Sequence, residues 1–198
     1  MTPSPAVLEP APTGRAKCRA CGQAITKGTV RLGERVPNTF ADGEEAETTH
    51  WYHPVCASFR RPEPLLDALQ RGDVEVVDRA GLEAEAAVGI AHHRAVRVDA
   101  AARAPSGRAT CRACKLPIAK DTWRIGLVFY EDGRFAPSGY IHAACASTYL
   151  ETTALLPRIR HFSTGLTDAD LAELAAAIGT AGPDEPGPVG PLGPSGAS

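Results

Sequence analysis

Short runs of apolar residues, set among polar and alanine-rich stretches, divide this chain into two similar series of elements. Val, Ile and aromatic residues gather in TVRLGERV (29–36) and TWRIGLVFY (122–130), a composition that predicts β-strands. An amphipathic pattern over 166–178 predicts a helix. Thr167 is a suitable N-cap for it, with Asp170 three residues further on.

Shorter segments complete the two series. HPVCASF (53–59) and HAACASTYL (142–150) each predict the opening of a helix. A weaker helical pattern covers 81–91. VEVV (74–77) and PRIRHF (157–162) predict short strands just ahead of the two amphipathic helices. Each series therefore contains both predicted strands and predicted helices.

Two stretches of the chain repeat one sequence. GRAKCRACGQAITKGTVRLG at 14–33 corresponds to GRATCRACKLPIAKDTWRIG at 107–126, with a constant offset of 93 positions. HPVCAS at 53–58 corresponds to HAACAS at 142–147, with an offset of 89, so the length difference lies in the loops between. Self-similarity of this kind indicates two copies of one structural unit.

All six cysteines fall within the repeat. Each copy has Cys-x2-Cys followed, after 31 or 27 residues, by His-x2-Cys. The two candidate ligand sets are Cys18, Cys21, His53 and Cys56, and Cys111, Cys114, His142 and Cys145. Three thiolates and one imidazole complete the tetrahedral sphere of zinc and leave no position for water. The pattern therefore predicts two structural zinc ions per chain, whose binding is coupled to folding.

Other interpretations of the cysteines explain less of the pattern. A redox Cys-x2-Cys pair would need neither the distal His-x2-Cys nor the duplication. A catalytic Cys/His pair does not account for three cysteines per copy, and buried cysteines without a metal need not repeat this register. The histidines outside the pattern are predicted to be solvated or part of a core: His50, His92, His93 and His161.

The composition favours two small cores over one large one. Large side chains are few, with five Phe, two Trp and one Met, whereas Gly and Pro number 19 and 17. Small cores often need a metal, so we expect two tandem zinc-stabilised modules, each a short antiparallel sheet with helices. The predicted divisions are a flexible Pro-rich tail at 1–13, module one at 14–98, a linker at 99–106, module two at 107–179 and a disordered Gly/Pro-rich tail at 180–198.

The N-terminal residues have neither the basic region nor the apolar run of a secretion signal. A run of about 18 apolar residues, as a membrane span requires, does not occur either. We therefore expect a soluble cytoplasmic protein, associated with the nucleoid if its source is bacterial. Thiols stay reduced in that compartment, which favours metal binding over disulfides.

The motif GRAxCxxC, followed by KGxxRxG and HWYHPxC, resembles the zinc fingers of eukaryotic poly(ADP-ribose) polymerases and of a nuclear DNA ligase. Module two matches through its ligands, GRATCRAC and AKDTWRIG, but has GYIHAAC where the aromatic pair would stand. The resemblance implies compact α+β zinc modules that recognise DNA strand breaks. It does not extend to the ADP-ribosyl transferase or ligase catalytic regions, so we expect the chain not to be an enzyme.

The net charge of −2 is unusual for a DNA-binding protein, but the charge is unevenly distributed. Residues 13–60 carry +2 and residues 106–149 carry +3, whereas 61–105 carry −2 and 150–198 carry −4. Positive charge thus gathers in the zinc-binding halves. We expect affinity to come from a few well-placed contacts and not from a wide basic field.

The candidates for DNA contact follow from the repeat and the resemblance together. Arginines that recur at equal offsets match phosphate-contacting positions of the family: Arg15, Arg31, Arg108 and Arg124. In that family an apolar pair from the following loop stacks on the base pair laid open at a break. The candidates here are Val36, Phe40, Phe129, Tyr130 and Phe135, with Phe40 the closest match. The alternatives are a solvated surface for the arginines and core packing for the aromatics.

We therefore predict a zinc-dependent protein that binds DNA at nicks, breaks or ends through phosphate contacts and base stacking. We expect it to have no catalytic activity, no membrane contact and no small-molecule substrate. The alternative is a zinc-finger adaptor that binds a protein partner through its acidic helices, at 63–90 and 166–178. A hydrolase would be a third class, but saturated zinc ligands argue against it.

Overall fold

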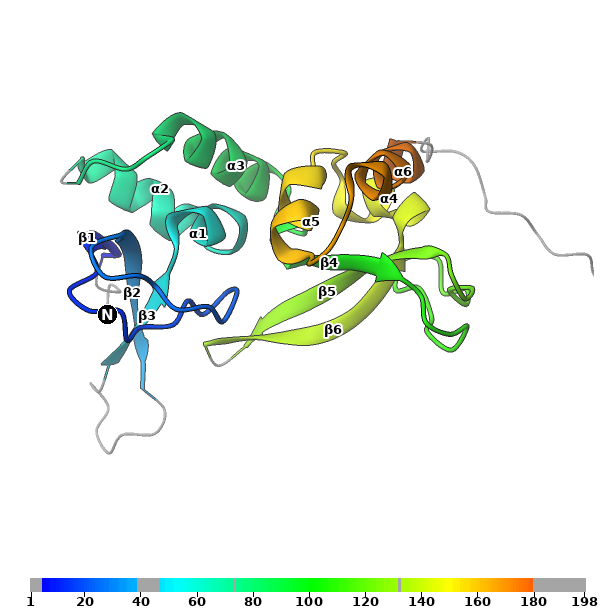
Figure 1. Cartoon of the computed structure of the whole chain (residues 1–198), viewed down its shortest axis with the longest axis horizontal. Coiled ribbons are helices and arrows are strands. Elements are labelled where there is room, and N and C mark those ends of the chain that lie inside the picture. Colours follow the sequence, from blue (N-terminus) through cyan, green and yellow to red (C-terminus); the bar gives the residue numbers. More distant parts are fainter. Residues whose placement is uncertain (1–4, 39–46, 73, 132, 180–198) are drawn as a thin grey trace, which may run out of the picture.

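The computed structural model describes residues 5–38, 47–72, 74–131 and 133–179. It contains two three-stranded antiparallel sheets, each with its own group of helices. In Figure 1 the sheets lie along one side of the molecule and the helices along the other. Within the described ranges, no helix has the length and apolar character needed to cross a membrane. The α+β fold with two tandem modules is confirmed.

Module one is built on a sheet of order β1-β2-β3, with helices packed against it. Its strands are β1 (Val7–Pro10), β2 (Val30–Pro37) and β3 (Glu47–Tyr52). Its helices are α1 (Pro54–Arg60), α2 (Pro62–Arg71) and α3 (Arg79–Ala91). The loop between β1 and β2 carries Cys18 and Cys21, and we call it and its counterpart in module two the knuckle loops. Fully buried apolar side chains from this loop, from the sheet and from α2 form the core of module one: Ile25, Leu32, Tyr52, Leu65 and Leu69.

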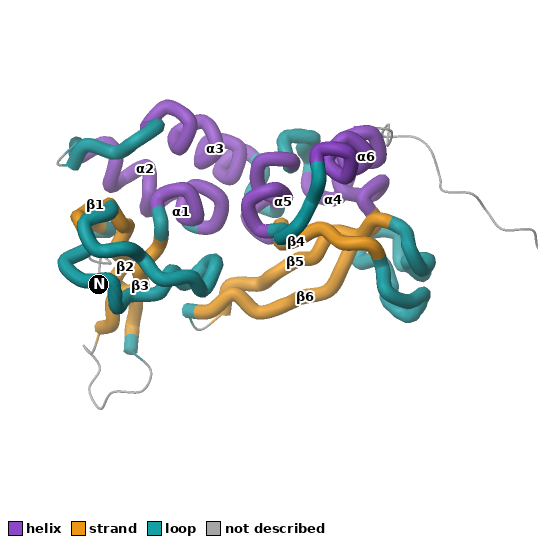
Figure 2. Tube along the Cα trace, viewed as in Figure 1, coloured by secondary structure: helices purple, strands orange, loops and turns teal. Residues whose placement is uncertain are grey.

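Module two has a second core on a sheet of order β4-β5-β6. Its strands are β4 (Val98–Arg103), β5 (Trp123–Glu131) and β6 (Arg134–His142). Its helices are α4 (Ala146–Leu150), α5 (Leu156–Phe162) and α6 (Asp168–Gly179). Single 3-10 turns precede β4 and α4, at η1 (Ala95–Arg97) and η2 (Ala143–Cys145). In both modules a long loop joins the first two strands, as Figure 2 shows.

The first strand of each sheet lies in a segment that shows no strand pattern in the sequence. β1 pairs with β2, placing Glu9 opposite Arg31, and β4 pairs with β5, placing Ala102 opposite Arg124. The expected linker at 99–106 is therefore mostly an edge strand, and part of the expected tail at 1–13 is a strand as well. Both segments are too short and too rich in Ala or Pro to show an alternating pattern, so pairing with the neighbouring strand decides their structure.

Some of the other predicted elements are confirmed and others are wrong. The strands expected at 29–36 and 122–130 are present as β2 and β5, and the helix expected at 81–91 as α3. The strand predicted at 74–77 is absent, and 157–162 lies in helix α5 instead of a strand. The β-branched and aromatic content of 157–162 misled the prediction, since tertiary packing overrides such propensities.

The N-terminus of α6 has the predicted cap. The Thr167 hydroxyl accepts a hydrogen bond from the Asp170 backbone N–H at 3.2 Å. The Asp170 carboxylate in turn accepts one from the Thr167 backbone N–H at 2.9 Å. This reciprocal arrangement satisfies two amides that an unprotected helix start leaves unpaired.

The two modules pack directly against each other through buried arginines. Arg158 of α5 is 0% exposed and donates to the backbone carbonyls of Phe59 at 3.1 Å and Glu85 at 2.6 Å, both in module one. Arg60 of α1 donates to the Asp99 carboxylate at 2.8 Å in the opposite direction. Burial lowers the pKa of Arg60 to about 10 although Asp99 opposes the shift, so Arg60 stays charged at neutral pH.

Aromatic rings complete this contact, which we call the seam. The Phe59 ring of module one lies 5.2 Å from His161 and 5.9 Å from Phe162, measured between centroids. The β5-β6 hairpin also extends toward module one (Figure 1). At its tip, Tyr130 lies under the guanidinium of Arg61 at 4.5 Å, and Phe135 packs against the core of module one. The two cores are thus separate, but the modules are not independent bodies.

Candidate metal centres and nucleic-acid interface

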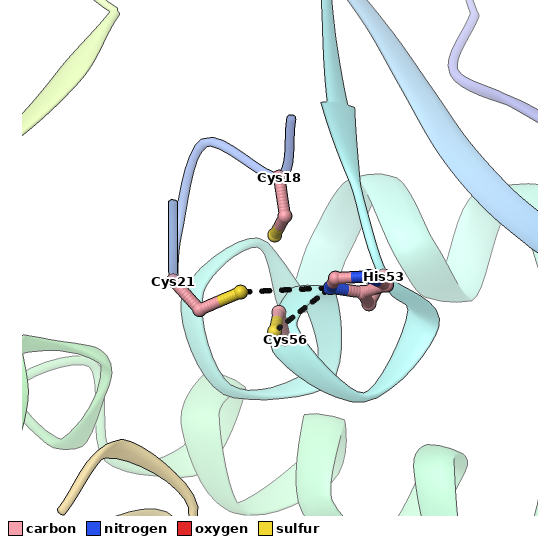
Figure 3. Close-up of side chains that lie close together, drawn as sticks. All are labelled: Cys18, Cys21, His53 and Cys56. Carbon is pink, nitrogen blue, oxygen red and sulfur yellow. Dashed lines mark hydrogen bonds between the residues drawn. The ribbon is translucent and has the colours of Figure 1, made fainter. Parts of the chain in front are cut away.

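The first metal centre is assembled from a tight turn and a helix start. Cys18 and Cys21 flank a turn closed by the Cys18 N–H to Gln23 carbonyl bond at 2.8 Å. Gly22 in this turn has φ +74°, a left-handed conformation that glycine adopts without strain. His53 occupies the N-cap position of α1, and Cys56 lies in the first turn of that helix. Figure 3 shows the four side chains converging on one point.

The spacing of the ligand atoms fits zinc. The His53 Nδ1 atom lies 3.5 Å from the Cys21 Sγ and 3.7 Å from the Cys56 Sγ (Figure 3). Tetrahedral zinc, with Zn–S near 2.3 Å and Zn–N near 2.1 Å, places sulfur and nitrogen about 3.6 Å apart. All four ligand atoms lie within 4.8 Å of one another. The residues therefore match the size of a zinc coordination sphere as well as its chemistry.

The second centre repeats this geometry in module two. The His142 Nδ1 atom lies 3.4 Å from the Cys114 Sγ and 3.8 Å from the Cys145 Sγ, and Cys111 completes the set. The His142 Nε2 lies 3.2 Å from the Pro117 carbonyl oxygen. That hydrogen bond holds the proton on Nε2 and leaves Nδ1 as the ligand atom, a common second contact of metal-bound histidine. The two Cys3His clusters support two structural zinc ions.

The thiols of the first centre cannot all ionise without a cation. A hydrogen bond from the Cys56 thiol lowers the pKa of Cys18 to about 4, and the same hydrogen bond raises the pKa of Cys56. Burial raises the pKa of Cys21 as well. Three thiolates in this space repel one another, so a divalent cation is needed to replace the protons that separate them.

His161 is a contact of the metal centre that the sequence analysis missed. Its Nε2 atom lies 3.1 Å from the Cys56 Sγ, across the seam from module two. An N–H donated to a zinc-bound thiolate offsets part of its charge and orients it. The sequence analysis expected His161 on a strand and connected it with neither metal centre, because 105 positions separate it from Cys56. His50 is buried in the seam, beside Tyr130 and Gly133.

Comparison with known families agrees with this geometry. Residues 9–85 match the family described as the poly(ADP-ribose) polymerase and DNA-ligase zinc-finger region. The matched segment contains the first Cys3His set, so the first module is similar to the zinc fingers of that family. The second Cys3His cluster, at the same sequence spacing pattern, supports a second finger of the same type. Within this fold the zinc ions serve to hold the knuckle, the sheet and the helix start together.

Individual relatives show the same partial match. The chain is 28% identical to a poly [ADP-ribose] polymerase of Drosophila melanogaster over 141 residues, covering 64% of this chain and 14% of that protein. It is 29% identical to poly [ADP-ribose] polymerase 1 of Gallus gallus over 135 residues, covering 59% and 13%. The chain thus matches only about 14% of the length of these relatives.

The four predicted phosphate-contacting arginines occupy different environments. Arg15 and Arg108 are exposed on the two knuckle loops. Arg31 is buried, paired with Glu9 and stacked on Trp51. Arg124 is half-buried and stacks on the ring of Tyr140. Equal spacing in the sequence therefore does not give equal availability to a ligand.

The predicted base-stacking residues also lie in different environments. Phe40 lies outside the described residues, and Val36 is half-buried in β2. Phe129 on β5 is 51% exposed. Tyr130 and Phe135 pack in the seam, which matches the alternative of core packing for these two rings. The remaining candidates for base stacking are therefore Phe40, Val36 and Phe129.

Proposed function

We propose that this chain binds DNA at strand interruptions through phosphate contacts and base stacking, without a catalytic step of its own. The observation that carries the proposal is the charge of the two knuckle loops, which adjoin the metal centres. Residues 14–29 hold four Lys/Arg and no Asp/Glu, and residues 107–122 hold four Lys/Arg and one Asp. Six of these cations recur at equal offsets and are exposed: Arg15, Arg19, Lys27, Arg108, Arg112 and Lys120.

The charge of the loops matters more than the net charge of the chain. Phosphate contacts act over short distances, because salt screens charges beyond about 10 Å. A cluster of exposed cations free of neighbouring carboxylates therefore favours a polyanion locally, even on an acidic protein. Helices α2, α3 and α6 carry seven of the 23 acidic residues, and Figure 1 shows these helices on the other side of each module from its sheet.

Discrimination of interrupted DNA would come from stacking. Phosphate contacts hold any duplex, whereas a ring can stack only where a base pair has an open face. Phe129, exposed on β5, and Phe40 are the candidate rings for that contact. A nick or an end has a distinct shape without a distinct sequence, which suits this mode of recognition. We propose that this activity is cytoplasmic, and associated with the nucleoid if the source is bacterial.

The metal centres support the part of the proposal that assigns no catalytic step to this chain. Three thiolates and an imidazole saturate each zinc, so neither ion has a site at which to activate water. The zinc ions would act by fixing the knuckle loops that carry the cations.

Binding to three forms of one DNA sequence tests the proposal. A closed circle, the same circle with one nick, and the linear blunt-ended form are titrated with zinc-loaded protein and separated by gel shift. Tighter binding to the nicked and linear forms than to the closed circle is expected. Equal affinity for all three would refute break recognition. No binding to any form would refute DNA binding and favour the protein adaptor.

A further inference from the structure

Arg97 is a half-buried arginine without a carboxylate partner. It ends η1, directly before β4, and it forms no ion pair with any residue that the structure describes. Four other buried or half-buried arginines each pair with a carboxylate: Arg31, Arg60, Arg61 and Arg158. A charge that is partly removed from water attracts an oxyanion more strongly than a fully solvated one does. The charge of Arg97 is therefore available to an anionic ligand.

Neutral oxygens from three strands and helices hold the Arg97 guanidinium in place. Its Nε donates to the Val128 carbonyl of β5 at 3.3 Å. Its Nη1 donates to the Tyr149 hydroxyl of α4 at 3.4 Å, and its Nη2 to the Ser138 hydroxyl of β6 at 3.1 Å. None of these oxygens carries a negative charge. The guanidinium is thus fixed in position while its charge stays unbalanced.

A break in the β5-β6 register brings Ser138 to this cluster. Val128 pairs with Pro137, but the preceding residue, Leu127, pairs with Gly139. Ser138 therefore has no partner on β5. A bulge of this kind re-aims a side chain, and bulges are frequent beside functional sites. Pro137 also has no N–H to donate, which leaves the Val128 carbonyl free to accept from the guanidinium.

The cluster offers a ligand only hydrogen-bond donors. A guanidinium carries five N–H donors, and Arg97 uses three of them, which leaves two. The Ser138 and Tyr149 hydroxyls accept from Arg97 through their oxygens, so each keeps its own hydrogen for another acceptor. Among the described residues, neither hydroxyl donates to such an acceptor. The two N–H groups, the two O–H groups and the positive charge together fit an oxyanion.

An exposed aromatic ring adjoins these donors. The centroid of the Phe129 ring lies 5.7 Å from the Arg97 guanidinium, and Phe129 is 51% exposed. A second arginine, Arg94, lies 5.5 Å from the centroid of the Tyr149 ring. Its charge is balanced, because it pairs with Glu151 at 3.3 Å. The site thus joins one unbalanced cation and its donors to an apolar surface on which a planar group can stack.

Module one has different residues at the corresponding positions. At the offsets of the repeat, Val36 stands in place of Phe129, and Arg60 stands in place of Tyr149. Arg60 is buried in the seam and paired with Asp99. The combination of ring, hydroxyl and unbalanced arginine is therefore a feature of module two.

We propose that Arg97, Ser138 and Tyr149 bind a terminal phosphate of a DNA strand, with the adjoining base stacked on Phe129. A terminal phosphate has three acceptor oxygens and a charge of about −1.5 to −2 at neutral pH. A phosphate within an intact strand carries a charge of only about −1, and a carboxylate has one oxygen fewer. The donors therefore favour the phosphate left at a break. This inference rests on the proposed recognition of strand interruptions and adds the chemical end group that the chain distinguishes.

Nicked DNAs that differ only in their end groups test the inference. Three hairpin-closed duplexes of one sequence carry a single nick with a 5′ phosphate, with a 3′ phosphate, or with hydroxyls on both sides. Fluorescence anisotropy measures their affinity for the zinc-loaded full chain. Because a base on Phe129 fixes the direction of the strand, one phosphorylated nick should bind about tenfold more tightly than the other two DNAs. Equal affinity for all three, or an equal gain from either phosphate, would overturn the inference while leaving break recognition intact.

Single substitutions then locate the preference for a phosphate. Arg97→Gln should abolish it, and Ser138→Ala and Tyr149→Phe should each lower it about threefold, because each removes one donor. Zinc content and thermal unfolding check the fold, and the two hydroxyl variants keep the arginine if Arg97→Gln does not fold. Arg160→Gln is the matched control, since Arg160 is in the same module and 71% exposed, and it should keep the full preference.

Two results separate this inference from the proposed function. A full preference in folded Arg97→Gln, or in both hydroxyl variants, would overturn the phosphate site and leave the recognition of nicks in place. Failure of the unmodified chain to bind any of the nicked DNAs would instead refute the proposed function, and this inference with it.

Discussion

Arg158 is the residue whose removal most directly tests the packing of the two modules. It is completely buried and donates to two backbone carbonyls of module one, those of Phe59 and Glu85. Arg158→Ala removes both bonds and leaves a cavity where the guanidinium stood. Hydrogen bonds from a charged donor contribute roughly 1.5–3 kcal/mol each. The recovered hydration of the buried charge offsets part of this, so we expect a net loss of about 2–4 kcal/mol.

Thermal unfolding followed by circular dichroism measures that loss. For a domain of this size about 1 kcal/mol corresponds to roughly 2–4 °C, so the melting temperature should fall by about 5–15 °C. The single transition of the unmodified protein should also separate into two, because each module keeps its own core. Arg160→Ala is the matched control, since that side chain is on the same helix but 71% exposed. Equal melting temperatures for the two variants, with one transition in each, would refute the role given to the seam.

Three further predictions concern the metal and the DNA. Elemental analysis should give two zinc ions per chain, and Cys21→Ala should give one and lower the stability of both modules, because the seam couples them. His161→Ala should accelerate zinc loss to a chelator from the Cys56 site about tenfold and leave the other site unchanged, whereas His92→Ala should alter neither. Phe40→Ala should cost about 1–3 kcal/mol on nicked DNA and almost nothing on a closed circle; an equal loss on both would remove Phe40 from break recognition.

The metal centres could be predicted from the sequence because their information is local. Each centre needs two short motifs, and the repeat shows both twice at consistent spacing. The turn that holds Cys18 and Cys21 and the helix start that holds His53 and Cys56 form within a few residues of their ligands. The α+β fold class followed from the same motifs, since they carry the family resemblance.

The seam could not be predicted, because its contacts join residues far apart in the chain. Arg158 and Phe59 are 99 positions apart, and the backbone carbonyl that accepts the hydrogen bond has no signature in the sequence. The surrounding segment was expected to be a strand, which would have pointed alternate side chains to opposite faces. In the helix that forms instead, Arg158 is fully buried while Arg160 is 71% exposed. Similarly, the ion pair of Glu9 with Arg31 depends on β1, which carries no pattern of its own.

The buried Arg158 also determines how the chain can be divided for experiments. A fragment that ends after α3 would keep every ligand of the first zinc yet lose the helix that covers Phe59, which is only 4% exposed in the whole chain. A fragment that begins at β4 would expose an arginine and the rings of Phe162, Tyr130 and Phe135 to water. Both pieces would present new apolar surface and would tend to self-associate. Weak DNA binding by either half would then report on this damage, so the contribution of each finger has to be assigned with single substitutions in the intact chain.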